Sequence, residues 1–460
     1  MAIQPEQRNS SIEFGRIANS LIFIIPCLTL LLKLFVASRI THSFEISGHL
    51  QGGGWLGADG ENYITGALEI SESNVLSKSP NLEFWPAGYP ILIWLMTKIS
   101  ISHILWVISI IQSVFYGYAS YYFTRQLRDT KIKPYLFWIA MALAFNPTLS
   151  LSSMAVGYES PIAACMLMIT GLIIKSQLNP IDRRFWIRVA GVGGFFALAS
   201  FMQPRWILTT LVVAIIWALA HKNRKHQALI LVGVMAIMAI APVALIARNQ
   251  KAGNGSVIST NLGVTMAIGA GDETSGGYQR KGPEVPCDPV PPATTVTDNE
   301  KVKCVLKWYA THPVKAVKLF INKGLFYWSP WSGPIVNGTM VRNPWLKIDP
   351  LLNIARGSQQ GHDLVYGAFG KIVSWAWMLG CISLFFIGFF WLRSFKGLYS
   401  QLAWLTFTPV VISWLVGMGT IGDHRFRLPT MSLSLFLQVI GIYALRHRAQ
   451  KGSFQVDSEA

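Results

Sequence analysis

Long apolar runs separated by short basic connections make up most of this chain. The first run, residues 17–37, can span a bilayer as a helix, because about 20 apolar residues cross the hydrocarbon core. Nine further runs predict spans at roughly 103–124, 134–152, 158–176, 186–202, 205–220, 227–247, 366–392, 400–418 and 428–446. Residues 89–99 are apolar but too short to cross, so we expect an interfacial helix there. The pattern predicts an all-α polytopic membrane protein with about ten transmembrane helices.

The basic residues sort to one side of this arrangement. With ten spans and a cytoplasmic N-terminus, the short basic connections and the tail after residue 446 all fall inside, as the positive-inside rule requires. Two large segments, 38–88 and 248–365, then lie outside. This divides the chain into an N-terminal transmembrane module (1–247) whose first outer loop is 38–88, a large outer loop region (248–365), and C-terminal helices with a cytoplasmic tail (366–460).

Composition agrees with a membrane protein. Of the 460 residues, 52% are hydrophobic and only 13% are charged, whereas soluble domains carry about 25% charged residues. The net charge of +17 is explained by the basic cytoplasmic loops, so we expect no nucleic-acid partner. Membrane lipids with anionic head groups, or a phosphate substrate, would also suit this charge.

The five cysteines fall into two groups. Cys27, Cys165 and Cys381 lie in apolar spans, where we expect them to pack without reacting. Cys287 and Cys304 lie in the polar outer loop, where an oxidising compartment would favour a disulfide between them. Two unrelated thiols remain the alternative. Their spacing does not fit a zinc site, since no second Cys/His pair accompanies them.

Acidic residues in the outer segments are the first candidates for chemistry. Asp59 and Tyr63 are four residues apart and share one face of a helix, with Glu61 nearby. A carboxylate close to the bilayer surface suits a general base acting on a lipid-linked substrate, although Asp59 is equally a favoured helix cap. Glu83 precedes a turn rich in Pro and Gly. Glu159 lies at the outer mouth of a span, where it either serves a site or complements a helix N-terminus.

Four arginines lie at the outer ends of spans, where the positive-inside rule disfavours them: Arg205, Arg248, Arg425 and Arg427. Guanidinium groups bind phosphate through paired hydrogen bonds, so this set indicates a phosphate ligand. The alternative is that these side chains extend to lipid head groups. His424 could ligate a metal or donate a hydrogen bond, but a lone histidine is more often structural.

The second outer segment changes character along its length. It is rich in Gly, Pro, Ser and Thr up to about residue 300, and from Val302 to Trp328 it becomes amphipathic, with aromatic residues interleaved with lysines. That combination is typical of an interfacial helix, and a small cap that packs on itself is the alternative. We find no internal repeat, which argues against a transporter built from inverted halves.

Several short motifs, in this order, resemble those of the GT-C superfamily of membrane glycosyltransferases. The bacterial branch related to protein O-mannosyltransferases and to the lipid A aminoarabinose transferase resembles this chain most. The motifs are Asp59 with Tyr63 and Ala67, Phe84-Trp85-Pro86-Ala87-Gly88-Tyr89-Pro90, Asn146-Pro147 followed by Glu159, Gln203-Pro204-Arg205, Arg248-Asn249 with the outer loop that follows, and Arg425-Phe426-Arg427-Leu428-Pro429. Many relatives carry adjacent Asp and Glu in the first loop, whereas here Gly60 separates Asp59 from Glu61.

The resemblance implies an inverting glycosyltransferase in a bacterial plasma membrane, with its site on the extracytoplasmic side. The donor would be a sugar on a polyprenyl phosphate, and the acceptor a glycan, lipid or protein. Asp59 would be the general base, and Arg425 and Arg427, with Arg205 or Arg248, would bind the phosphate. Tyr63, Glu83 and Glu159 would contact or position substrate. A divalent metal is possible, with Glu61 and His424 as candidate ligands.

Two other classes remain open from the residues alone. A transporter or flippase of lipid-linked sugars would use the same outer arginines without a base, and a non-catalytic membrane scaffold would bind a partner through its outer loops. A transporter predicts ionisable residues near the middle of spans, yet the acids and arginines gather at the outer ends. This distribution favours chemistry at the membrane surface.

Overall fold

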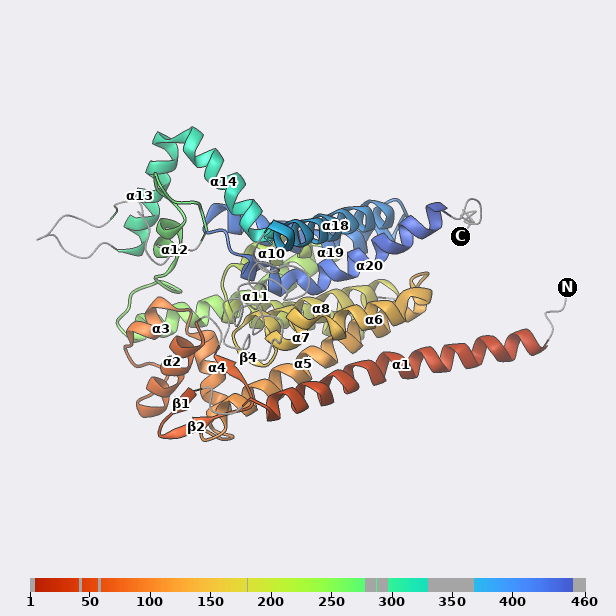
Figure 1. The fold of residues 1–460 in the computed structure, drawn as a ribbon, viewed down its shortest axis with the longest axis horizontal. Helices are drawn as coiled ribbons and strands as arrows, with labels where there is room; N and C mark the ends of the chain where they lie inside the picture. Colours follow the sequence, from red (N-terminus) through yellow and green to blue (C-terminus); the bar gives the residue numbers. More distant parts are fainter. Residues whose placement is uncertain are drawn as a thin grey trace, which may run out of the picture.

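The computed structural model describes residues 5–40, 44–56, 59–179, 181–277, 287, 297–329 and 368–449. These parts form an elongated helical bundle with two smaller groups of short elements at one end (Figure 1). The first helix begins, and the last helix ends, at the opposite end of the bundle. The molecule therefore has two unlike ends, and the described parts of segments 38–88 and 248–365 share one of them.

Eight helices in the described part of the chain are long and apolar enough to cross a membrane. They are α1 (Pro5–Ser38), α5 (Ile104–Gln126), α8 (Glu159–Gln177), α9 (Arg183–Met202), α11 (Arg224–Lys251), α18 (Ala368–Arg393), α19 (Leu398–Gly419) and α20 (Leu428–Ala449). The expectation of an all-α polytopic membrane protein is thereby confirmed. Eight of the ten expected spans correspond to these helices.

The remaining two expected spans form shorter helices. The span expected at 134–152 is divided into α6 (Leu136–Phe145) and α7 (Pro147–Ser152), because Asn146 is extended and its side chain caps the N–H of Leu149. Pro147 has no N–H with which to continue α6. The span expected at 205–220 is α10 (Trp206–Leu219), whose 14 residues rise about 21 Å. Each is therefore shorter than the hydrocarbon core, which is about 30 Å thick.

Helix α8 forms the centre of the bundle. Within its apolar window 89% of residues are buried, against 33% for α1, so α8 is enclosed by other helices while α1 lies at the edge. Helices α18 and α20 approach each other closely, and a side chain at Gly388 or Gly441 would overlap the backbone of the facing helix. These glycines allow the close helix contact that small residues permit in membranes.

A group of short elements follows α1. Strands β1 (Phe44–Ile46) and β2 (His49–Gln51) form an antiparallel hairpin whose turn residues, Ser47 and Gly48, both have positive φ, as a two-residue hairpin turn requires. Helices α2 (Gly60–Glu72), α3 (Pro80–Phe84) and α4 (Gly88–Thr97) complete the group. Helix α4 is the short helix expected at 89–99. Strand β3 (Trp55–Leu56) pairs in parallel with β4 (Ala155–Val156) and so ties this group to the start of α8.

The second group is made of α12 (Leu262–Ile268), α13 (Asp298–Thr311) and α14 (Pro313–Trp328). The sequence predicted one amphipathic helix over 302–328, and the structure has two because His312 leaves the helical conformation before Pro313. These helices share a small core of Met266, Ala267, Ala270, Val305, Trp308 and Leu319. Val314, Val317 and Ile321 remain exposed on α14, so the group packs on itself and also presents an apolar face.

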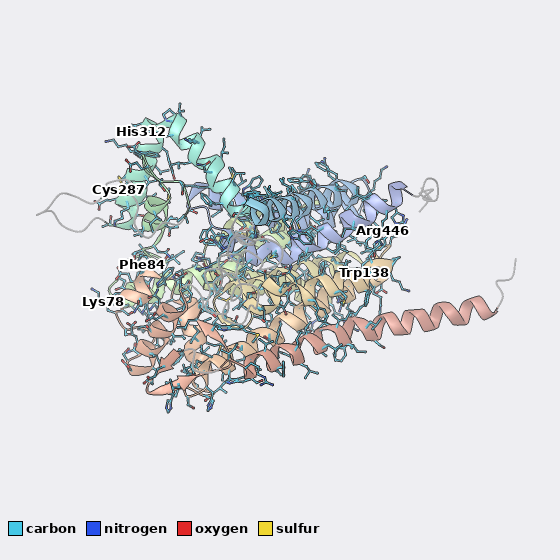
Figure 2. The ribbon with its side chains drawn as sticks, viewed as in Figure 1. Lys78, Phe84, Trp138, Cys287, His312 and Arg446 are labelled. Carbon is cyan, nitrogen blue, oxygen red and sulfur yellow. A yellow bond between two sulfur atoms is a disulfide. The ribbon has the colours of Figure 1, made fainter. Side chains whose placement is uncertain are left out.

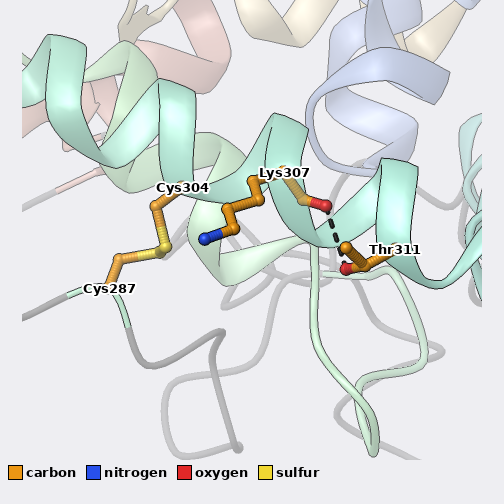
Figure 3. Close-up of a disulfide and its surroundings, with 4 residues drawn as sticks. All are labelled: Cys287, Cys304, Lys307 and Thr311. Carbon is orange, nitrogen blue, oxygen red and sulfur yellow. Dashed lines mark hydrogen bonds between the residues drawn. A yellow bond between two sulfur atoms is a disulfide. The ribbon is translucent and has the colours of Figure 1, made fainter.

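A disulfide joins Cys287 to Cys304 on α13, the pair for which the sequence left two alternatives (Figure 3). It closes a loop between positions 17 residues apart. On the same helix, the hydroxyl of Thr311 donates to the carbonyl of Lys307. The free cysteines of the described residues are Cys27, Cys165 and Cys381, which lie in α1, α8 and α18.

Candidate functional site

Arg425 bridges two carboxylates at the end of the bundle that carries the short elements. Its Nη2 donates to Oδ2 of Asp59 at 2.6 Å, and its Nε donates to Oε1 of Glu159 at 2.5 Å. The three side chains are mostly buried, with exposures of 14% for Arg425, 23% for Asp59 and 11% for Glu159. The structure thus brings together three residues from three separate parts of the chain.

Strand pairing and helix starts place the two acids. The pairing of β3 with β4 aligns the chain before Asp59 with the chain before Glu159. Asp59 occupies the position before the first residue of α2, but its side chain makes no capping hydrogen bond. Glu159 is the first residue of α8, where a negative charge complements the helix dipole. The carboxylate of Asp59 therefore accepts a hydrogen bond from Arg425 and does not cap α2.

A short turn places Arg425. The 3-10 helix η5 (His424–Arg427) follows α19, and the Asp423 side chain caps it by accepting the N–H of Arg425 at 3.0 Å. The N–H of Gly422 donates to the carbonyl of Gly276, which ties this turn to the segment that follows α11. On the other side, the hydroxyl of Ser413 on α19 donates to the carbonyl of Phe426. The turn is therefore anchored both to the bundle and to the segment that follows α11.

Aromatic rings enclose the cluster. Tyr63 is buried against Trp85, Tyr89 and Tyr158, with ring centroids 5.2 to 6.0 Å apart. Burial raises the pKa of the Tyr63 hydroxyl well above its usual range, and the negative charges of neighbouring groups add to this effect. Tyr63 therefore stays neutral, so its hydroxyl remains a hydrogen-bond donor beside the two carboxylates.

Tyr89 lies in the motif at 84–90, but the sequence did not indicate the role of Tyr89 or of Tyr158. The hydroxyl of Tyr89 accepts the N–H of Gly157 at 2.9 Å and a hydrogen bond from Gln112 at 2.7 Å. The hydroxyl of Tyr158 accepts from the side chain of Gln203 at 3.1 Å. These bonds fix the chain just before Glu159. The only sequence signal was that Tyr158 directly precedes an acid at the mouth of a span.

Arg205 lies next to this cluster and is partly buried. Its guanidinium lies 4.6 Å from the ring centroid of Phe426 and 5.9 Å from that of Tyr158, which are cation–π distances. Within the described residues, the Nε and Nη2 atoms of Arg205 have no hydrogen-bond partner. The guanidinium of Arg425 lies 6.0 Å from the centroid of the same Tyr158 ring, so both positive charges lie close to Tyr158.

Arg248 and Glu83 lie in a different part of the same end. The guanidinium of Arg248 donates to the carbonyls of Val75, Ser77 and Leu82, and so anchors the chain between α2 and α3 to the end of α11. The carbonyl of Glu83 accepts the N–H of Thr260. These contacts join neighbouring segments and do not connect either side chain to Asp59.

Arg427 is buried, and its guanidinium donates to backbone carbonyls. Its Nη1 donates to the carbonyls of Tyr327 and Ser329, at the end of α14. His424 is also buried, and its Nδ1 lies 3.3 Å from the carboxylate of Asp423. Glu61 is exposed in the first turn of α2. In the described ranges no three His, Cys, Asp or Glu side chains gather as a metal site would require.

The fold and this cluster define a helical membrane protein with buried, paired charges at one end of its bundle. No family model matches the sequence, and neither does any curated protein. Among solved structures, the chain is similar to the archaeal oligosaccharyltransferase AglB from Archaeoglobus fulgidus, in complex with an inhibitory peptide and a dolichol-phosphate, with 12% identity and a TM-score of 0.47. The match covers 96% of this chain and 52% of the archaeal chain, so this chain spans about half the length of the archaeal protein.

Proposed function

We propose that this protein is an integral membrane glycosyltransferase. It transfers a sugar from a polyprenyl-phosphate donor to an acceptor on the extracytoplasmic face, with inversion and with Asp59 as general base. The observation that carries the proposal is the bridge that Arg425 makes between Asp59 and Glu159. A general base for the acceptor and a cation for the phosphate leaving group must both reach the same substrate. Asp59 and Arg425 meet this requirement, because their side chains are in direct contact.

The charges of the cluster suggest how a donor would enter. Two carboxylates share one bridging guanidinium, so an additional phosphate needs another positive charge close by. Arg205 supplies this charge, since its Nε and Nη2 are unpaired among the described residues. When the phosphate binds between Arg205 and Arg425, the Nη2 of Arg425 turns from Asp59 to a phosphate oxygen. Donor binding thereby releases Asp59 for the acceptor, while Glu159 keeps the other edge of Arg425 in place.

The chemical step follows from these positions. Asp59 accepts the proton of the acceptor hydroxyl or amine as the acceptor atom bonds to the anomeric carbon. The bond from that carbon to the phosphate oxygen breaks, and its electron pair leaves with the polyprenyl phosphate. Arg425 and Arg205 stabilise the charge that develops on the phosphate. The single displacement inverts the anomeric centre, by the logic of inverting glycosidases with the acceptor in place of water.

Two observations support an extracytoplasmic site. The basic connections of the bundle would be cytoplasmic by the positive-inside rule, and Asp59 lies at the other end. The disulfide between Cys287 and Cys304 also belongs to that other end, where Cys287 lies on the same side as Lys78 and Phe84 (Figure 2). Disulfides persist in oxidising compartments, so both observations indicate the same orientation. We infer a plasma membrane of bacterial type, with the site on its outer side.

The test compares Asp59→Asn with Glu61→Gln in purified, detergent-solubilised protein. Glu61 is a matched control, because it is an acid two residues away that is exposed in the same helix start. The assay measures release of undecaprenyl phosphate from a panel of undecaprenyl-phosphate sugars with membrane extracts as acceptors. We expect Asp59→Asn to lower kcat by about 10²- to 10⁴-fold, as loss of a general base does, and Glu61→Gln to change it little.

Binding must be followed separately from turnover. Asn at position 59 still accepts a hydrogen bond from Arg425, so the variant should fold and bind undecaprenyl phosphate as the wild type does. Turnover at the wild-type rate in Asp59→Asn would remove Asp59 as the base. A wild-type protein that binds the donor but transfers to none of the acceptors would favour a transporter or a scaffold.

A further inference from the structure

A groove of about 450 Å³ opens between α6 and α20, and none of the residues that line it belongs to the Asp59 cluster. One wall is formed by Trp138, Met141, Ala142 and Phe145 of α6, and the other by Leu435, Val439, Ile442 and Tyr443 of α20. The volume is within the range of about 300–1,000 Å³ found for sites that bind small molecules. Because both walls are apolar, the groove suits a hydrocarbon chain.

The two ends of the groove are polar and differ in character. Asn146 closes one end, and its side-chain oxygen is already used to cap α7. Arg446 lies at the other end and is exposed, with its guanidinium 5.9 Å from the ring centroid of Tyr443. In Figure 2, Trp138 and Arg446 lie together at the end of the bundle opposite Lys78 and Phe84. The groove thus begins at the basic end of the molecule.

The length of the groove matches one leaflet of a bilayer. Helix α6 has 10 residues and rises about 15 Å, which is half of a hydrocarbon core about 30 Å thick. The wall ends at Asn146 because Pro147 redirects the chain there. From Leu435 to Arg446, α20 rises a similar distance, about 16 Å. A chain that entered beside Arg446 would therefore reach Asn146 near the middle of the membrane.

Contacts around the mouth hold its residues in place. The ring of Tyr135 stacks on Tyr443 with centroids 3.7 Å apart, and its hydroxyl lies 2.5 Å from Nε2 of His447. His447 in turn stacks on Trp391 of α18. Tyr443 and the end of α20 are therefore fixed before any ligand binds. A preformed groove avoids the entropy cost of ordering its walls on binding.

The positive charge of Arg446, at the exposed end of the groove, favours one kind of lipid head group. No carboxylate pairs with Arg446 in the part of the chain that the structure describes, and the neighbouring connection carries exposed Lys131 and Lys133. An exposed arginine beside an apolar groove attracts a phosphate with a net negative charge. We propose that this groove binds one acyl chain of an anionic phospholipid, with the lipid phosphate held by Arg446. The bound lipid would be a resident of the leaflet at the basic end, distinct from the substrates of the Asp59 site.

Phosphatidylglycerol and phosphatidylcholine are the probes for a first experiment. The purified full-length protein is titrated with each lipid and the retained lipids are counted by native mass spectrometry. We expect Arg446→Gln to weaken retention of phosphatidylglycerol about fivefold, as loss of one basic residue at a membrane surface does, and to leave phosphatidylcholine unchanged. Ala142→Phe narrows the groove and should reduce retention of both lipids.

Arg393→Gln is the matched control. Arg393 is also exposed, lies in the last turn of a membrane-spanning helix, and has its guanidinium 5.2 Å from the ring centroid of Trp404, but it does not line the groove. The Arg393→Gln variant should retain phosphatidylglycerol as the wild type does. An equal loss in Arg393→Gln and Arg446→Gln would mean that both arginines merely reach the head groups of bulk lipid, and would overturn the proposal.

Cross-linking locates the chain without relying on a variant. A phosphatidylglycerol with a diazirine near the end of one acyl chain should label residues 138–146 and 435–443 more strongly than α1, whose exposed Leu28, Leu31 and Phe35 form an apolar surface outside the groove. Labelling of α1 at the same level as α6 and α20 would contradict a specific lipid site.

Discussion

Arg425 donates its Nη2 to the carboxylate of Asp59 at 2.6 Å, across a sequence separation of 366 residues. This contact joins the N-terminal and C-terminal parts of the chain, because Asp59 directly precedes α2 and Arg425 lies in the turn before α20. Neither residue would reach the other without the pairing of β3 with β4 and the cap that Asp423 gives to η5. A change to this ion pair should therefore affect both the stability of the fold and the proposed site.

The first prediction concerns the stability of this cluster. Arg425→Gln leaves the carboxylates of Asp59 and Glu159 close together and without their cation. Breaking a buried ion pair costs about 3–5 kcal/mol, and partial exposure of the cluster reduces this to about 2–3 kcal/mol. We expect a lower Tm in detergent, measured by differential scanning fluorimetry.

A second substitution separates this effect from a general loss of packing. Glu159→Gln in the Arg425→Gln background removes one of the two unpaired charges, so the double variant should be more stable than Arg425→Gln alone. If the effects of the two single substitutions simply add, the bridge does not contribute as the geometry indicates.

The sequence predicted the all-α membrane architecture, and it named Asp59 and Glu159 as candidate site residues. Hydrophobic runs of span length located eight membrane helices, since length and apolarity alone fix that property. The division of the span at 134–152 was missed although Asn146-Pro147 was visible, because apolar residues continue on both sides of it. The mean hydropathy of this segment is that of a continuous span, and a single missing N–H does not change it.

The arrangement of the arginines could not be predicted in the same way. Arg205, Arg248, Arg425 and Arg427 all lie at ends of expected spans, and their charge alone does not distinguish them. The structure differs for each, because Arg248 and Arg427 donate to backbone carbonyls while Arg425 meets carboxylates. Which acceptor an arginine finds depends on long-range packing, and this information is absent from local sequence.

The second prediction concerns Lys323 on α14, which is fully buried. Its Nζ donates to the hydroxyl of Tyr309 and to the carbonyl of Thr420, each at 2.7 Å, so it links α13 and α14 to the segment before η5. Burial lowers the pKa of Lys323 from 10.5 to about 7. The unfolded chain therefore binds a proton between pH 7 and pH 10.5 that the folded protein does not, and stability rises with pH across that window.

The measurement is Tm against pH for Lys323→Met and for Lys318→Met. Lys318 is the control, since it is an exposed lysine on the same helix. We expect the wild type to gain roughly 2–3 kcal/mol of stability between pH 7 and pH 9, and this gain to disappear in Lys323→Met and persist in Lys318→Met. A pH dependence unchanged by Lys323→Met would show that other groups cause it.

The last prediction concerns the orientation of the protein in the membrane. This orientation decides on which side the Asp59 cluster and the lipid groove lie. Lys78, between α2 and α3, and Arg224, the first residue of α11, are both exposed and belong to opposite ends of the bundle. In a background where Cys27, Cys165 and Cys381 are replaced by alanine, an impermeant maleimide should label Lys78→Cys in intact bacterial cells. It should label Arg224→Cys only after lysis, because the positive-inside rule puts the basic end in the cytoplasm. The reverse pattern would place the Asp59 cluster and the disulfide inside the cell, where a lasting disulfide is disfavoured, and would move the proposed lipid site to the outer leaflet.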